Sequence, residues 1–354
     1  MSKNEYKGKR ILVTGGTGSI GSVIVKYLLT RDPLQVRVLS RDESKQFNLF
    51  HEVGNDKRLR LLIGDIRDKE RVERAMDGVD IVFHAAAMKH VVACENDPYE
   101  AVKTNVLGTQ NIIDCALAKG VAKVIGISTD KATDPVSVLG CTKLLAEKTM
   151  LASHFYKGAR KTKFCFVRFG NVLSTRGSVE PLFYRQIMNG GPVTVTDKQM
   201  TRFFISVDEA ISLVFKAAEL MQDREIFILK MPIIRIHDLA KAMIELYAPR
   251  FKRDPKKVKI DLIGAKNGER THEKLLSKDE AAYALETKDM FIIVPVIGLE
   301  NPDYKEFSHL YGGAKRSPWQ DYSTEGKKVL SVADIKKKLS ADEDCLNRTL
   351  NLYL

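Results

Sequence analysis

The stretch RILVTGGTGSIG, residues 10–21, decides the fold of this chain. Its first five residues are rich in branched apolar side chains, as in a buried strand, and the residues after the glycines have helical periodicity. Gly15, Gly18 and Gly21 permit a tight turn, let a pyrophosphate approach the backbone and let the helix pack on the strand. The amino terminus of that helix stabilises the phosphate charge. The stretch therefore predicts a dinucleotide-binding site within a βαβ unit.

The same rhythm of strand and helix continues along the first half of the chain. Short apolar runs recur, and most are separated by helix-periodic segments such as Ser19–Thr30 and Ala101–Ala118. The strands are expected at Arg10–Thr14, Val36–Leu39, Leu59–Ile63, Ile81–His84, Val124–Ile127 and Phe164–Val167. This alternation predicts an α/β fold with a doubly wound parallel sheet of the Rossmann type.

The pattern changes after about Arg168. Turn-rich pieces are followed by expected helices near Val207–Leu220 and Ile236–Tyr247, and a lysine-rich helix around Val332–Leu339 is expected on the surface. We expect residues 1–172 to form the dinucleotide-binding domain, with later returns to it near 203–235. Residues 173–354 would form a smaller C-terminal domain and tail over the carboxyl edge of the sheet, where ligands of α/β proteins bind.

Composition argues against several classes of protein. The chain of 354 residues is 44% apolar, yet no segment approaches eighteen consecutive apolar residues and its start lacks the apolar core of a signal peptide. The five cysteines are odd in number and include no CxxC pair, and the seven histidines show no metal-ligand spacing. We therefore expect a cytoplasmic protein with reduced, packed thiols, no metal site and no membrane association.

The formal charge of +12 suits an acidic partner. The densest basic run, residues 250–259, contains only Phe251 as an aromatic for base stacking and lacks a nucleic-acid motif. We interpret this run as a solvated connection between a helix and a strand, and we expect no nucleic-acid partner.

The end of the second strand bears on which dinucleotide binds. An NAD-specific site would present an acidic residue there to the ribose hydroxyls, whereas this chain offers Ser40 and Arg41, with Lys45 one turn later. Arg41 suits a 2′-phosphate through charge-assisted hydrogen bonds, so the sequence favours NADP. The adjacent Asp42 leaves a ribose contact open. Asp65, after the third strand, would accept from the adenine amino group or serve as a helix cap or turn residue.

Seven motifs in one order resemble a known family. TGGTGSIG, GDIRD, HAAAMKHV, TNVLGTQN, STDKA, RFGNVLSTRGSV and MTRFFIS resemble the extended short-chain dehydrogenase/reductases, specifically the polysaccharide-biosynthesis branch that contains inverting UDP-N-acetylglucosamine 4,6-dehydratases. The resemblance runs from residue 9 to about 285 and resumes at YSTEGKKVLSVADIKKKL. It implies a Rossmann domain with a smaller nucleotide-sugar-binding domain, tightly held NADP, UDP-N-acetylglucosamine or a related UDP-hexosamine as substrate, and a homo-oligomer, often a hexamer.

The expected cofactor contacts follow the strand ends and the matching motifs. The cofactor-binding residues are expected to be Thr14, Gly15, Thr17, Gly18, Ser19, Ile20, Ser40, Arg41, Lys45, Asp65, Ile66, Ala85, Ala86, Asn105 and Lys143. By resemblance, Asn105 supports the active-site helix and Lys143 contacts the nicotinamide ribose.

The chemistry that the resemblance implies has three steps: oxidation at C4 of the sugar, elimination of water across C5 and C6, and return of the hydride to C6. The C4 ketone acidifies the C5 hydrogen, so an ordinary side chain can remove it. In the related dehydratases, the residues matching Asp130 and Lys131 in STDKA act as acid and base. We expect burial to raise the pKa of Asp130 and to lower that of Lys131. A turn with a local ion pair is the alternative interpretation.

Leu139 occupies the position, four residues before Lys143, where short-chain dehydrogenases carry a tyrosine. Some related dehydratases have methionine there, and Leu139 resembles that subgroup. Removal of the C4 hydroxyl proton then falls to Lys131, which we favour, to a water held by Thr129 or Lys143, or to another residue. The expected catalytic residues are Thr129, Asp130, Lys131 and Lys143.

Most of the substrate-binding residues are expected in the second half of the chain. Asn171 and Arg202 match diphosphate-binding positions of the family, and the arginine fork can engage two phosphate oxygens. Thr194 and Thr196 alternate on a short strand and would face the uridine. GAKNGERTHEKLL resembles a glycine-rich loop before a helix, with a ribose partner at Glu273. The expected substrate-binding residues are Lys89, Asn171, Thr194, Thr196, Met200, Arg202, Arg270 and Glu273.

The resemblance implies a UDP-N-acetylglucosamine 4,6-dehydratase activity, inverting at C5, that forms a UDP-4-keto-6-deoxy-hexosamine. One alternative is a multifunctional relative that also epimerises at C3. A second is a UDP-hexose 4-epimerase, against which Asp130 and Lys131 argue because an epimerase has no hydroxyl to expel. A third, from another class, is an NADP-sensing protein without chemistry.

Overall fold

The computed structural model of the chain describes residues 4–175, 177–264, 268–295, 308–343, 346, 347 and 350. Parts of two quoted motifs and one of the five cysteines lie outside the described residues. They are Arg176, residues 265–267 and Cys345. Among those described, no helix combines the length and the apolar character needed to cross a membrane.

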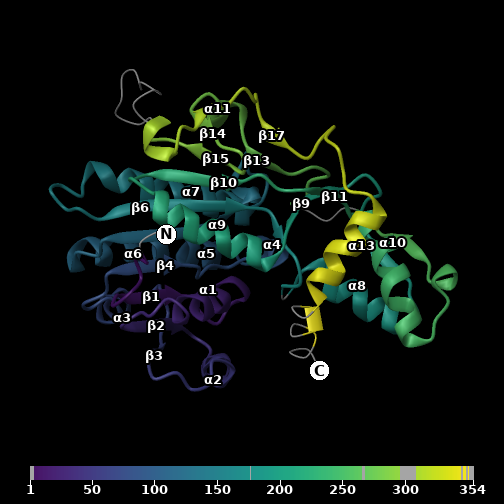
Figure 1. The fold of residues 1–354 in the computed structure, drawn as a ribbon, viewed down its shortest axis with the longest axis horizontal. Helices are drawn as coiled ribbons and strands as arrows, with labels where there is room; N and C mark the ends of the chain where they lie inside the picture. Colours follow the sequence, from purple (N-terminus) through teal and green to yellow (C-terminus); the bar gives the residue numbers. More distant parts are fainter. Residues whose placement is uncertain are drawn as a thin grey trace.

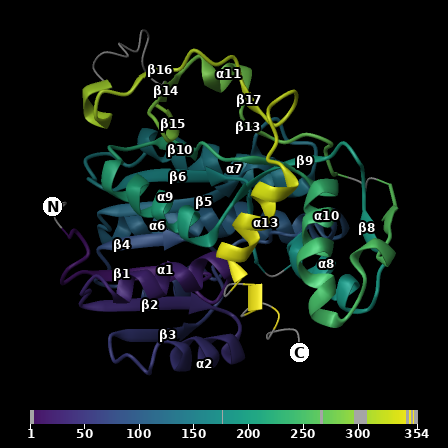
Figure 2. The ribbon, with the colours of Figure 1, turned by 45° about the vertical axis from the view of Figure 1, so that its right-hand side comes forward.

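The first half of the chain forms the parallel sheet that the sequence predicts. Its strands are β1 (Arg10–Thr14), β2 (Gln35–Ser40), β3 (Leu59–Ile63), β4 (Ile81–His84), β5 (Lys123–Thr129) and β6 (Lys163–Phe169). They pair in parallel in the order β3-β2-β1-β4-β5-β6, which Figure 2 shows from bottom to top. All six carboxyl ends therefore meet at one edge.

Helices cover both faces of this sheet. The main ones are α1 (Ser19–Leu29), α2 (Glu43–Glu52), α3 (Lys69–Ala75), α6 (Gly108–Lys119), α7 (Val138–Ala152) and α9 (Val207–Leu220). On one face, α1 packs against α9. On the other, α6 packs against both α3 and α7. Both α7 and α9 contact β5 and β6. The central strands are consequently buried on both sides, which explains their continuous apolar runs.

The helix expected over Ala101–Ala118 is divided. It starts as α5 (Pro98–Ala101), passes through a π-helical stretch, η1 (Val102–Leu107), and continues as α6. A π-helical turn inside a helix often accompanies a functional site, because it redirects the side chains within it. Asn105, one of the expected cofactor-site residues, lies in this stretch.

The sheet extends beyond β6 with strands from the second half of the chain. These are β10 (Glu225–Leu229), β15 (Met290–Ile293), β14 (Ala284–Glu286) and β16 (Lys315–Arg316). β10 is parallel to β6, whereas β15, β14 and β16 add in antiparallel pairs. β10 lies within the later return expected near 203–235, and β14, β15 and β16 bring the chain back to the sheet again after it. A domain boundary after residue 172 stays a prediction.

A smaller lobe lies beside the carboxyl edge of the main sheet (Figure 1). It contains β7 (Asn171–Val172), β8 (Val193–Val195), β9 (Thr201–Ile205), β11 (Ile233–Arg235), β12 (Ile260–Leu262), α4 (Val91–Asn96) at its border, α8 (Val179–Met188), α10 (Ile236–Tyr247) and α13 (Val332–Ala341). A second apolar cluster, separate from that of the large sheet, fills the space between α8, α10 and α13.

The lysine-rich helix α13 is less superficial than its composition indicates. Ile335 and Leu339 are 2% and 3% exposed and pack against α10, so the expectation of a surface helix holds only for its lysine face. The basic run of residues 250–259 does connect α10 to β12, through the short turns η4 (Ala248–Phe251) and η5 (Pro255–Lys257), as predicted.

Two further corrections concern local structure. The loop before Glu273 leads into a strand, β13 (Lys274–Leu276), and not into the expected helix; the four-residue helix α11 (Lys278–Ala281) comes only afterwards. β13 pairs in antiparallel fashion with β17 (Tyr322–Ser323) of the tail. Cys141, expected as a packed thiol, is exposed.

Candidate active site

The glycine turn after β1 has the geometry that its sequence predicts. Gly15 has a φ of +66°, and a Cβ built there would lie 2.7 Å from the Cα of Ala86. A Cβ on Gly21 would lie 2.3 Å from the carbonyl oxygen of Gly15. Gly18 caps α1 without a side-chain acceptor for the first-turn amides of Ser19 and the residues after it. The residues present therefore fit a dinucleotide whose pyrophosphate approaches this turn.

The expected cofactor residues lie together at the carboxyl edge. Thr14, Ser40, Asp65 and Ala85 each end a parallel strand or follow one directly, on β1, β2, β3 and β4. Most of the other members belong to the loops or first helical turns that follow these strands, and Asn105 and Lys143 lie on η1 and α7. The members in the loops and first turns are Gly15, Thr17, Gly18, Ser19, Ile20, Arg41, Lys45, Ile66 and Ala86. The structure thus brings the predicted set to one edge.

Charges beside β2 are arranged in pairs. The carboxylate of Asp42 caps α2, accepting from the backbone amide of Lys45 at 2.9 Å, and it also pairs with the Lys45 ammonium. Arg41 is 63% exposed, with Nη1 3.7 Å from Asp65 Oδ2. Arg41 is the most exposed basic side chain at this corner, at 63% against 46% for Lys45 and 34% for Arg67, which leaves its guanidinium the most accessible to a phosphate.

Asp65 is held as a carboxylate. It accepts from the backbone amide and from Nε of Arg67, both at 2.9 Å. Burial raises the pKa of Asp65, but the hydrogen bonds from Arg67 and the charge of Arg41 outweigh it, so the net shift is downward. Arg67 was not among the expected site residues, although its place two residues after Asp65 in GDIRD was the available signal.

A buried polar chain supports the cofactor edge from below. Thr14 Oγ1 is 2.8 Å from His84 Nδ1, His84 Nε2 is 3.1 Å from Thr109 Oγ1, and that hydroxyl donates to the carbonyl of Asn105 at 2.7 Å. Burial, with the nearby charge of Lys143, lowers the pKa of His84 to about 3, so the imidazole is neutral near pH 7. The chain links the glycine turn to the π-helical stretch.

Asn105 continues that support toward α7. Its Oδ1 accepts from the backbone amide of Met88 at 2.8 Å, and its Nδ2 donates to Thr142 Oγ1 at 3.1 Å. Met88 follows β4 and Thr142 is the neighbour of Lys143. The geometry therefore favours the supporting role expected for Asn105.

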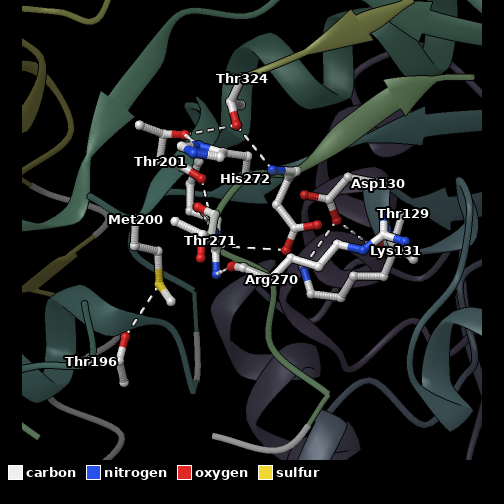
Figure 3. A network of polar contacts seen from close by, with 12 residues as sticks. Thr129, Asp130, Lys131, Thr196, Met200, Thr201, Arg270, Thr271, His272 and Thr324 are labelled. Carbon is white, nitrogen blue, oxygen red and sulfur yellow. Dashed lines mark hydrogen bonds and ion pairs between the residues drawn. The ribbon is translucent and has the colours of Figure 1, made fainter. Parts of the chain in front are cut away.

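Asp130 and Lys131 begin a short 3₁₀ turn, η2 (Asp130–Ala132), directly after β5. Asp130 is 1% exposed, and its Oδ1 accepts from Thr129 Oγ1 at 2.8 Å and from Lys131 Nζ at 3.0 Å (Figure 3). Its second oxygen, Oδ2, is buried and has no hydrogen-bond partner within the described parts of the chain. An unpartnered buried carboxylate oxygen is costly, which favours a role for it toward a ligand.

Lys131 also contacts a carboxylate that comes from far along the chain. Its Nζ is 3.4 Å from Oε1 of Glu273, which is itself buried. Burial lowers the pKa of Lys131, but Asp130 and Glu273 outweigh it, so the pKa is raised and the expected downward shift is wrong. Burial raises the pKa of Glu273, and the charges of Lys131 and Arg202 offset only part of that effect. The pKa values of Lys131 and Glu273 are therefore both raised, and these two side chains form a cluster with Asp130.

The segment that carries Glu273 is fastened by Arg202. Arg202 donates to the carbonyl oxygens of Arg270 at 2.7 Å and of Thr271 at 3.1 Å, and its Nε is 3.6 Å from Glu273 Oε1. Arg270 donates in turn to the carbonyl of Thr133 at 3.2 Å. Arg202 therefore serves the protein's own backbone here, and contact with a diphosphate stays a prediction.

The C-terminal tail also contacts the segment that carries Glu273. The sequence did not indicate these contacts. Thr324 Oγ1 accepts from the amide of Glu273 at 2.9 Å, and the Thr324 amide donates to the Glu273 carbonyl at 2.9 Å. Thr201 joins it, with Oγ1 2.8 Å from both His272 Nδ1 and Thr324 Oγ1 (Figure 3). Of YSTEG, only Tyr322 and Ser323 form strand β17, and Thr324 after it is hydrogen-bonded to Glu273.

Lys143 and Leu139 lie on the buried side of α7. Lys143 Nζ donates to the carbonyl of Ile127 at 2.6 Å, and burial, partly offset by Glu147, lowers its pKa to about 8. Leu139 is buried in a small apolar cluster with Cys94 and Ala101. The tyrosine position is therefore filled by packed aliphatic carbon, and no acid–base group replaces it there.

Several expected substrate residues stand apart from this cluster. Thr194 Oγ1 accepts from Gln186 at 2.7 Å, and Thr196 contacts Met200 Sδ on the side of Figure 3 away from Asp130. The alternation of Thr194 and Thr196 is present, although β8 ends between them. Lys89 is exposed before α4, and Asn171 Oδ1 is buried with no partner among the described side chains and backbone. Their ligand contacts stay predictions.

The fold and the site define a Rossmann-type protein of the extended short-chain dehydrogenase/reductase class. A model of the family described as polysaccharide biosynthesis protein matches residues 11–295, and the chain belongs to that family. The expected family and fold class are thereby confirmed.

Curated relatives differ in their names. The chain is 53% identical over 292 residues to an uncharacterized membrane protein of Methanocaldococcus jannaschii, covering 82% of this chain and 87% of that one. It is 42% identical over 296 residues to the UDP-N-acetylglucosamine 4,6-dehydratase (inverting) of Campylobacter jejuni, covering 83% and 85%. It is 38% identical over 338 residues to a UDP-glucose 4-epimerase of Rickettsia canadensis, covering 94% and 96%.

Solved structures agree on the fold. Pen from Bacillus thuringiensis superposes with a TM-score of 0.89 at 40% identity, covering 96% of this chain and 99% of that one. The dTDP-glucose 4,6-dehydratase DesIV of Streptomyces venezuelae, solved with NAD and TYD bound, gives a TM-score of 0.66 at 24% identity over 74% and 86% of the two chains.

Proposed function

We propose that the protein is an NADP-dependent UDP-N-acetylglucosamine 4,6-dehydratase, a carbon–oxygen lyase of the cytoplasm that inverts C5. The observation that carries the proposal is the Asp130–Lys131–Glu273 cluster at the end of β5, at the same edge of the sheet as the glycine turn. The Campylobacter relative carries this name at 42% identity. Residues 1–172 would hold the cofactor and residues 173–354 would contribute most of the sugar side.

The cluster supplies what an elimination needs. A bound NADP would supply the hydride acceptor for C4 and the hydride donor for C6. Lys131 must lose its proton before it can take the C5 hydrogen, and Glu273 at 3.4 Å, with its raised pKa, is the acceptor within reach. Asp130 has one oxygen held by Thr129 and Lys131, which leaves Oδ2, when protonated, to give its proton to the C6 hydroxyl that departs as water. Lys131 thus serves the C5–H bond and Asp130 serves the C6–O bond, the two bonds that break in the elimination.

A UDP-hexose 4-epimerase is the second candidate, since the Rickettsia relative bears that activity in its name and covers nearly the whole chain. An epimerase returns hydride to C4 and expels no hydroxyl, so it has no use for an acid at C6. The buried Asp130 with its open oxygen favours the dehydratase.

The deciding experiment incubates the purified protein with UDP-N-acetylglucosamine in deuterated water and follows the sugar by mass spectrometry and proton NMR. Loss of one water with deuterium at C5 and an L-configured ring supports the proposal. Additional deuterium at C3 would indicate the multifunctional enzyme, and a C4 epimer without water loss would indicate the epimerase. An unchanged sugar in the presence of bound NADP would favour a binding protein.

Arg41 is expected to set the choice of dinucleotide. Replacement of Arg41 by alanine should weaken NADP binding about 10- to 100-fold and leave NAD binding nearly unchanged, because one charge-assisted hydrogen bond contributes roughly 1.5–3 kcal/mol. Asp42 is engaged in capping α2, so it is not expected to favour NAD in the parent protein. Calorimetric titration of both dinucleotides measures the effect, with the exposed Arg74→Ala on α3 as control. Equal weakening of both would contradict it.

We expect a homo-oligomer, formed through the apolar surface of α5, η1 and α7. Leu107 and Leu145 are about half exposed there, next to an open apolar groove of about 520 Å³ lined by Tyr99, Val102 and Val136 among others. Exposed apolar surface of this kind marks an interaction site. Leu145→Glu should shift the mass measured by light scattering toward the monomer, whereas Lys148→Glu on the same helix should not. A monomeric parent protein would refute the expectation.

A further inference from the structure

Arg168, the last residue but one of β6, is 0% exposed and carries a charge that the proposed mechanism does not use. Its guanidinium binds two carboxylates at once. Nη2 and Nε contact Glu147 at 2.6 and 3.2 Å, and Nη1 and Nη2 contact the two oxygens of Glu280 at 2.9 Å each. Both carboxylates are therefore engaged by two guanidinium nitrogens, a geometry that only the arginine fork provides.

Two uncharged acceptors complete the shell. Nη1 also donates to Thr133 Oγ1 and to the carbonyl of Leu275, both at 3.0 Å. Ser128, which pairs with Arg168 in the β5–β6 register, donates to Glu147 from the other side. We call Arg168, Glu147, Glu280, Thr133 and Leu275 the Arg168 cluster.

Each contact of Arg168 reaches a segment that carries a candidate catalytic group. Thr133 follows the η2 turn of Asp130 and Lys131. Glu147 lies one helical turn after Lys143 on α7. Leu275 and Glu280 belong to β13 and α11, directly after Glu273. These segments are far apart in the sequence, and within the described chain Arg168 is the side chain that contacts all three.

We propose that Arg168 is a positioning residue, which fixes the η2 turn, α7 and the β13–α11 segment relative to one another and so sets the spacing of Asp130, Lys131, Lys143 and Glu273. It does not touch the sugar. The proposal deepens the proposed function and rests on it for the part of the test that measures turnover.

Stability alone is a weak explanation for this cluster. Taking three charges out of water is expensive, and buried ion networks can often be replaced by packed apolar side chains without loss of stability. An apolar side chain cannot donate the directed hydrogen bonds by which Arg168 holds a carbonyl, a hydroxyl and two carboxylates. One arginine does not neutralise two carboxylates. Glu280 is further stabilised as a carboxylate by the amide of Ser277, in the capping box of α11.

The test compares Arg168→Lys with the parent protein. Lysine keeps the positive charge and loses the fork, so it should preserve folding but release at least one of the three segments. Amide hydrogen exchange, measured by mass spectrometry at 10 °C, should rise at least tenfold in residues 268–280 and in the turn and helix around 130–147. Turnover of UDP-N-acetylglucosamine at the same temperature should fall about 100-fold in kcat, since displacement of reacting groups by about 1 Å costs that much.

Two matched variants make the test specific. Arg37→Lys replaces a partly buried arginine on β2 that holds the carbonyls of Ala75 and Asp77, remote from the site, and should leave exchange in 268–280 and kcat unchanged. Glu280→Gln removes one carboxylate only and should raise exchange in 268–280 while sparing 130–147. If Arg168→Lys fails to fold, Glu280→Gln alone decides the proposal.

Unchanged local exchange in Arg168→Lys, or a kcat within threefold of the parent at 10 °C, would overturn the proposal. A lower unfolding temperature with uniform exchange across the whole sheet would also overturn it, since that is the result of a purely stabilising role. If the parent protein itself does not dehydrate UDP-N-acetylglucosamine, the proposed function fails. Hydrogen exchange, which needs no substrate, still decides the role of Arg168.

Discussion

Replacement of Lys131 by alanine is expected to abolish water loss while NADP still binds. The change removes the proposed base at C5 and leaves Asp130 and Glu273 as two buried carboxyls without their shared cation. General base catalysis contributes about 10²–10⁴-fold to rate, so turnover should fall by at least about 10³-fold when the base and the charge balance are lost together. Mass spectrometry of the sugar in deuterated water measures both water loss and exchange at C5.

The conservative and remote variants sharpen this result. Lys131→Arg keeps a cation between the carboxylates but cannot act as a base near neutral pH, so it should stay folded and inactive. Lys216→Ala removes a lysine paired with Asp289 at 2.7 Å on the far side of α9 and should turn over normally. Water loss by Lys131→Ala at more than a tenth of the parent rate would show that another group takes the C5 hydrogen.

Replacement of Gly140 by alanine should be nearly as damaging, although it adds one methyl group to a helix. A Cβ at Gly140 would lie 2.2 Å from the carbonyl oxygen of Lys131 and 2.9 Å from Pro135 Cβ. The first neighbour is backbone and cannot rotate away, so α7 and the η2 turn must separate. We expect a loss of about 1–3 kcal/mol in the free energy of unfolding, as for other overpacked sites, and a fall in kcat of about 100-fold.

The sign of the stability change makes this prediction decisive. In a helix without such a contact, glycine to alanine is favourable by about 1 kcal/mol. A more stable Gly140→Ala protein with full activity would therefore contradict the close approach of α7 to the Lys131 turn. Chemical unfolding and turnover are measured side by side, with Cys141→Ala, an exposed neighbour on the same helix, as control.

The sequence is informative where a segment is buried on both sides. β1, β3, β4 and α10 coincide with the expected bounds, and β2, β5 and β6 differ by at most two residues, because continuous apolar runs and helical periodicity reflect local burial. β14, β15 and β16 were not predicted, because they are antiparallel strands outside the alternation of strand and helix from which the parallel strands were inferred. The buried face of α13 rests on Ile335 and Leu339 alone, which its many lysines obscure.

The candidate site was predictable as a set of positions and less so as a set of contacts. Motif order indicated Asp130, Lys131 and Glu273, but not that the last two meet. Burial lowers the pKa of Lys131, but Asp130 and then Glu273 raise it by more, and the expected downward shift took only burial into account. Arg168 and Thr324 were missed because each acts on a partner that only the folded chain brings near, whereas Arg67 was missed although its partner Asp65 is only two residues away.

The pairing of β17 with β13 also bears on how the protein is made. Thr324 holds Glu273 through two hydrogen bonds, and Tyr322 bonds both the amide and the carbonyl of Met231. A ribosome makes the chain from its amino terminus, so the sheet and the dinucleotide site can form on the nascent chain well before residue 324 emerges. The Glu273 side of the site is completed only at the end of synthesis, and an unfinished chain would bind its dinucleotide before it gained the power to act on a sugar.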